Sequence, residues 1–314
     1  MNRTHQDDEN WSGNKSTRLF GNLRDSIYIT LSPDSDEYPD KVPLHFSYRE
    51  LIRYASFSLF CCFVSFFVIR IFNTLVLSLF LRLNNIAHTY RLLEVNYHNS
   101  SASNWSEGKL LFIHLVPYVV FVMLGMFMPG WIRKSRSWYV HLAVTWMSFN
   151  MVIFVISELV YGLFDYSGLG VPLKWFSPNI YVAIAEVVIF TFLLLTGVGR
   201  FGWFFLQSAP HLDFSMDYQV VRSWFTYALL IPFVVCFMAI PFIVNMNQFF
   251  HLLITLVVSF VAIVIVFGTI TKVYVVGMND EQPHTVPAYV WLIVFAVIMT
   301  GLLFIKDSRF ILYS

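Results

Sequence analysis

Charged residues are scarce in this sequence. They make up 12% of its 314 residues, about half of the 25% that is usual in soluble domains. Hydrophobic residues reach 57% and the mean hydropathy is +0.65. This composition predicts a polytopic membrane protein whose main partner is the lipid bilayer, with other membrane subunits as further candidates. The formal net charge of +1 and the lack of a basic block give no argument for a nucleic-acid partner.

Cysteine is scarce as well. Cys61, Cys62 and Cys236 all lie inside apolar runs, and none has a CxxC spacing. The sequence therefore supports neither a disulfide framework nor a thiolate zinc site.

Long apolar runs are abundant. Seven of them reach the roughly 20 residues that a membrane-spanning helix needs, at 53–82, 109–128, 138–164, 179–206, 222–244, 247–275 and 286–305. The fifth and sixth can also form one re-entrant unit, so six or eight spans remain alternatives. We expect an all-α transmembrane bundle over residues 51–314, preceded by a polar, largely disordered tail at residues 1–50.

The distribution of basic residues predicts an orientation. Arg133, Lys134 and Arg136 form the densest basic cluster, which the positive-inside rule places in the cytoplasm. The N-terminus is then cytoplasmic and the C-terminus outside, although Lys306 and Arg309 at the outer end oppose this assignment.

Five ionisable residues on five predicted spans fall in the outward leaflet: Glu158, Glu186, Arg70, His114 and His251. Glu158 is about 9 Å deep at 1.5 Å per residue, and Glu186 has nearly the same depth. Charges inside a span are costly, at roughly 2.5–3.5 kcal/mol each on insertion scales. They can form an anion pocket, a proton relay or a metal site, with Glu158, Glu186, His114 and His251 as candidate ligands.

The alternative is a set of satisfied interfacial side chains. All but Arg70 lie within two turns of a predicted helix end, where they can reach the headgroups at little cost. Asn150 and His141, in the inner half of the third span, form a secondary polar pair. Asn150 alone can serve as a structural hydrogen bond between helices.

The segment GVGRFG at 197–202 matches the G-x-G-x-x-G pattern of nucleotide-binding sites. It follows a hydrophobic helix rather than a strand, so the match does not indicate nucleotide binding. Gly197 and Gly202 are expected to permit close helix packing or a bend. Pro232 and Pro241 in one span, and Pro117 in another, are expected to kink their helices.

Residues 141–176 resemble a family of uncharacterised polytopic inner-membrane proteins of Bacteroidetes. The resemblance is carried by Trp146, Ser148 and Asn150 on one helix and by the turn around Gly168 and Gly170. It implies a bacterial inner membrane and no particular chemistry.

Three functions follow as hypotheses. The first is transport of a small solute or ion, or service as a subunit of a transport or envelope complex. The second is an integral-membrane enzyme with a metal or acid/base site near the outer leaflet, in which haem ligation by His114 and His251 is a remote variant. The third is a structural or assembly subunit. The sequence identifies neither a cofactor nor a substrate.

Overall fold

The computed structural model describes residues 48–86, 88–91, 94–97, 106–132, 137–165, 168–208, 224–242, 249–270, 288–305 and 309–310. Nearly all of the predicted tail and the basic cluster at 133–136 lie outside the described residues.

Five described helices are long and apolar enough to cross a membrane. They are α2 (Tyr48–Leu83), α3 (Glu107–Trp131), α4 (Trp138–Tyr161), α6 (Ile180–Val198) with its continuation α7 (Arg200–Gln207), and α10 (Phe249–Ile270). These helices fit an integral membrane protein.

Two shorter apolar helices lie where the fifth and seventh spans were predicted. The first, Thr226–Ala239, comprises η3 (Thr226–Leu230) and α9 (Ile231–Ala239) and is followed by η4 (Ile240–Phe242). The second, Tyr289–Ile298, lies within α11 (Ala288–Ile305). The count of seven spans therefore remains a prediction.

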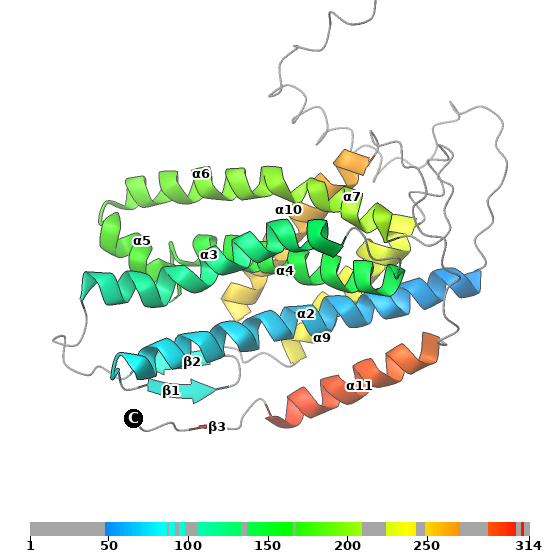
Figure 1. Ribbon diagram of the computed structural model, residues 1–314, viewed down its shortest axis with the longest axis horizontal. Helices are drawn as coiled ribbons and strands as arrows, with labels where there is room; N and C mark the ends of the chain where they lie inside the picture. The colour runs from blue at the N-terminus through cyan, green and yellow to red at the C-terminus, as the bar shows by residue number, and fades with distance from the viewer. Residues whose placement is uncertain are drawn as a thin grey trace, which may run out of the picture.

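Helix α4 lies at the centre of the bundle, because it packs against α2, α3 and α10. Most of α4 is buried inside the protein, whereas α6 exposes most of its apolar side chains. Aromatic contacts show that two helices run parallel to α2. Trp224 and Phe237 contact Tyr54 and Phe66 in the same order along the chain, and Trp291 and Phe295 of α11 contact Phe57 and Phe63 in the same order. The axes of α2, α3, α6 and α11 are roughly aligned, and α3 and α6 run opposite to α2 and α11 (Figure 1).

A small antiparallel sheet packs beside the C-terminal end of α2 (Figure 1). It has the order β2-β1-β3, formed by Glu94–Tyr97, His88–Arg91 and Arg309–Phe310. The segment after α2 and the segment after α11 thus meet at the same end (Figure 1). These strands were not foreseen in the all-α prediction, which holds for the rest of the described chain.

Pro232 interrupts the hydrogen bonding of its helix. Pro232 has no N–H, so the carbonyl of Ala228 lacks its usual α-helical donor. The hydroxyl of Ser58 on α2 donates to that carbonyl instead. The preceding turn, η3, is a π-helix, a rare conformation that occurs mostly as a single turn within α-helices. Two further prolines, Pro117 and Pro129, lie inside α3.

The close packing predicted in GVGRFG is seen at Gly197, and the same prediction for Gly202 stays a prediction. The segment spans the junction of α6 and α7, and Gly199 at that junction accepts a hydrogen bond of 2.9 Å from the hydroxyl of Thr269 on α10. A Cβ on Gly197 would meet the side chain of Met126.

Candidate functional site

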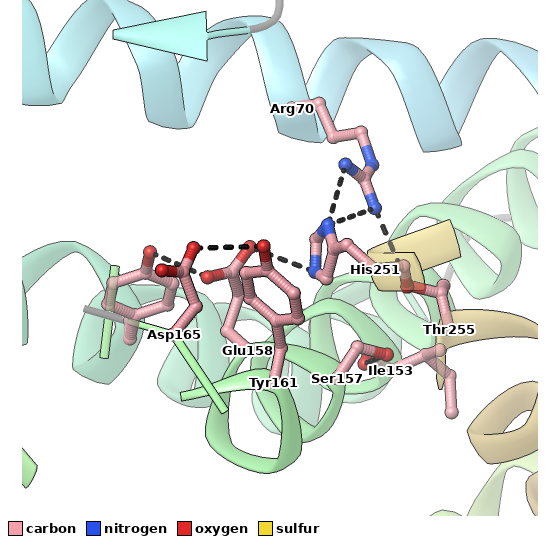
Figure 2. A network of polar contacts seen from close by, with 9 residues as sticks. Arg70, Ile153, Ser157, Glu158, Tyr161, Asp165, His251 and Thr255 are labelled. Carbon is pink, nitrogen blue, oxygen red and sulfur yellow. Dashed lines mark hydrogen bonds and ion pairs between the residues drawn. The ribbon is translucent and has the colours of Figure 1, made fainter. Parts of the chain in front are cut away.

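Three of the predicted outward-leaflet residues meet between α2, α4 and α10. Figure 2 shows His251 between Arg70 and Glu158. Nδ1 of His251 lies 3.3 and 3.4 Å from the two terminal nitrogens of Arg70, and Nε2 lies 3.2 Å from Oε1 of Glu158. Each residue comes from a different helix, so the contact depends on how the helices pack.

The guanidinium group of Arg70 decides which ring nitrogen of His251 carries a proton. Arginine has N–H donors and no acceptor, so Nδ1 of His251 must accept from Arg70 and carries no proton. The single ring proton of a neutral imidazole is then on Nε2, facing Glu158. In this state one positive and one negative charge balance within the site.

The contact between His251 and Glu158 is close but not aligned. Although Nε2 is within ion-pair distance of Oε1, no hydrogen bond from this nitrogen has acceptable geometry. The proton of Nε2 is therefore held beside the carboxylate without being directed at it.

The second oxygen of Glu158 faces α3 and the turn after α4. Oε2 accepts a long hydrogen bond of 3.4 Å from the hydroxyl of Tyr118. Gly168, at φ +50° in the left-handed region, covers the same oxygen so closely that a Cβ there would collide with Glu158 and Tyr118. This position needs glycine for both its conformation and its contact.

The surroundings are apolar. Arg70, His251 and Glu158 expose only 7%, 7% and 8% of their surface. The guanidinium carbon of Arg70 lies 4.7 Å from the ring centre of Phe66 and 5.7 Å from that of Phe154, within the range of cation–π attraction. The site is a buried charged network inside a membrane-type bundle.

Two predicted residues take other places. Glu186 on α6 accepts a hydrogen bond of 2.7 Å from Ser177, at the turn between α5 (Gly170–Phe176) and α6. His114 is buried on α3, one turn before Tyr118, and is not one of the sticks labelled in Figure 2.

The secondary pair is divided as well. Asn150 donates to Ser65 at 2.6 Å and to the carbonyl of Cys62 at 3.2 Å, linking α4 to α2. His141 is buried near the start of α4, where its carbonyl accepts from Thr145.

Several neutral members of the site were not predicted from the sequence. Tyr118 binds Glu158, and Thr255 accepts from Arg70 at 3.5 Å. The ring of Tyr161 lies 4.7 Å from the ring of His251, and its hydroxyl donates to Asp165. A usable signal existed, since Tyr118 and Thr255 lie four residues after His114 and His251 and hence on the same helix faces.

Among the described residues, no group of three or more His, Cys, Asp or Glu side chains is arranged to hold a metal ion. The comparisons with protein-family models, curated proteins and solved structures found no match.

Proposed function

We propose that this integral membrane protein moves a small solute or ion, and that Arg70, His251 and Glu158 form a proton-binding element coupled to that movement. The observation that supports it is the contact of His251 with Arg70 on one side and Glu158 on the other, inside an apolar bundle. Buried ionisable residues in spans characteristically mark proton and ion pathways.

An added proton cannot enter this network without a rearrangement. On Nδ1 of His251 it would face the guanidinium of Arg70, placing two cations about 3.3 Å apart. On Glu158 it would remove the negative charge that balances Arg70. In both cases Arg70 loses a stabilising partner, so proton binding favours a different relative position of α2 and α10.

The membrane and orientation belong to the same proposal. The apolar helices support membrane insertion, and the basic cluster supports a cytoplasmic N-terminus and an external C-terminus. The resemblance to Bacteroidetes proteins supports a bacterial inner membrane.

Charge displacement tests the proposal without knowledge of the substrate. The full chain is reconstituted in liposomes adsorbed on a solid-supported membrane, and the external pH is stepped. We expect a transient current from the wild type and its loss in Glu158→Gln and His251→Asn, compared at equal amounts of folded protein.

Glu186→Gln is the matched control, because its carboxylate binds Ser177 outside the network and the current should persist. A current that is unchanged in the Glu158→Gln/His251→Asn double variant, or is absent from the wild type, would contradict the proposal.

A further inference from the structure

A small cavity adjoins the charged network on the side away from Glu158. Its polar walls are Arg70, Asn150 and Thr255, and the rings of Phe66 and Phe154 line it as well. About 10 Å³ is open to the centre of a water molecule, close to the minimum that one buried water requires.

Unused hydrogen-bonding groups occur on the residues that line this cavity. Nε of Arg70 is buried and has no hydrogen-bond partner, on a side chain that is more than nine-tenths buried. Asn150 uses its amide N–H₂ for Ser65 and the Cys62 carbonyl, so its Oδ1 remains available as an acceptor. Buried polar groups without partners are rare and are commonly satisfied by ordered water.

We infer that the cavity beside Arg70 is a binding site for one water molecule. The water accepts from Nε of Arg70 and donates to Oδ1 of Asn150, with Thr255 Oγ1 as a further acceptor. A small anion fits these groups less well, because the walls also present the Asn150 and Thr255 oxygens and the faces of two aromatic rings, all of which carry partial negative charge.

This water would join two sets of polar contacts into one. Ser65 and Asn150 lie on one side of it, and Arg70, His251 and Glu158 on the other. The polar contacts between α2 and α4 would then continue into the charged network. The role of this water in proton movement rests on the proposed function, whereas its binding does not.

Infrared difference spectra of the full chain in nanodiscs, compared between H₂¹⁶O and H₂¹⁸O, test the binding. We expect the wild type to show an isotope-shifted O–H stretching band from an ordered internal water. Ile153→Phe, which fills the cavity from an apolar wall, should remove the band. Ile189→Phe makes the same change on the exposed face of α6 and should keep it.

Thr255→Val is a second cavity variant, for use if Ile153→Phe fails to fold. It removes one hydrogen-bond partner of the water without changing the side-chain size, so it should shift or weaken the band. A band unchanged in both cavity variants, or a high-resolution structure with an empty or halide-occupied cavity, would overturn the water site. An ordered water in a protein that gives no pH-step current would leave the site standing and overturn only the proposed function.

Discussion

At the residue scale, the site depends on two opposite charges that share one imidazole. Removing water from Arg70 and Glu158 is costly, and their mutual attraction compensates only while both are present. His251 lies between the two charges, with Nδ1 beside Arg70 and Nε2 beside Glu158. The loss of either charge therefore harms the protein more than the loss of both.

A double-mutant cycle on the two charges measures this dependence. Glu158→Gln should lower the free energy of unfolding by roughly 3–5 kcal/mol, because it leaves a buried, uncompensated cation. Adding Arg70→Met should recover most of that loss. The measurement is denaturant unfolding in detergent, with Glu186→Gln as the control that changes stability little. Strictly additive effects would show that the two charges do not interact.

Gly168 offers a second prediction at this scale. Gly168→Ala should destabilise the protein by at least roughly 1–2 kcal/mol, the usual cost of a left-handed residue with a side chain. Its new Cβ would also collide with Glu158 and Tyr118. Gly301→Ala is the control, since nothing lies within 4 Å of a Cβ there. Equal melting temperatures for the two variants would argue against the tight turn over Glu158.

At the element scale, one carbonyl in the helix around Pro232 accepts its hydrogen bond from a neighbouring helix. Ser58 on α2 donates to the carbonyl that Pro232 leaves without a donor. The same hydroxyl accepts from the indole of Trp146 on α4 at 2.6 Å. The hydroxyl of Ser58 thus connects α2 to α4 and to the helix that contains Pro232.

Ser58→Ala should cost about 1–3 kcal/mol of stability, since it leaves buried groups without partners. In a Pro232→Ala background the cost should fall, because a restored N–H at residue 232 can bind the Ala228 carbonyl. Thermal unfolding of the two single variants and the double variant gives the coupling. If Ser58→Ala is equally costly in both backgrounds, the hydroxyl does not compensate for the proline.

At the scale of the whole molecule, the two ends of the bundle differ. One end is packed with aromatic side chains such as Tyr54, Trp138 and Trp224. The other carries the charged network and the three-stranded sheet, which brings residues near the C-terminus to the hairpin after α2. In a membrane, the chain between the hairpin after α2 and the strand after α11 must therefore cross the bilayer an even number of times.

A disulfide tests that arrangement. Tyr90 and Phe310 are paired across antiparallel strands, and paired Cα atoms lie about 4.5–5.5 Å apart, within disulfide range. Tyr90→Cys/Phe310→Cys should form the cross-link under mild oxidation, detected as a mobility shift after cleavage between the two sites. The pair Tyr90→Cys/Ser135→Cys, predicted to lie on opposite sides of the membrane, should not.

Orientation is tested by labelling intact cells with a membrane-impermeant thiol reagent. Cysteine at Ser101 should react and cysteine at Ser135 should not, because the basic cluster predicts a cytoplasmic position for the second. The native cysteines are buried among the described residues and should contribute little background. The reverse pattern would place the charged network in the cytoplasmic leaflet.

The sequence by itself determined that the chain belongs in a membrane and which of its polar residues are unusual. Hydropathy is a local property, so a run of about 20 apolar residues is visible without knowledge of its neighbours. The same locality explains why Arg70, Glu158 and His251 stood out, since each interrupts an apolar run.

The tertiary structure alone decided which of those residues meet. Glu158 and Glu186 have nearly the same predicted depth, yet one binds His251 and the other Ser177. Tyr118 and Thr255, which carry no charge, complete the site. Depth follows from position along one helix, whereas a partner follows from the rotation and packing of several helices, which no single apolar run encodes.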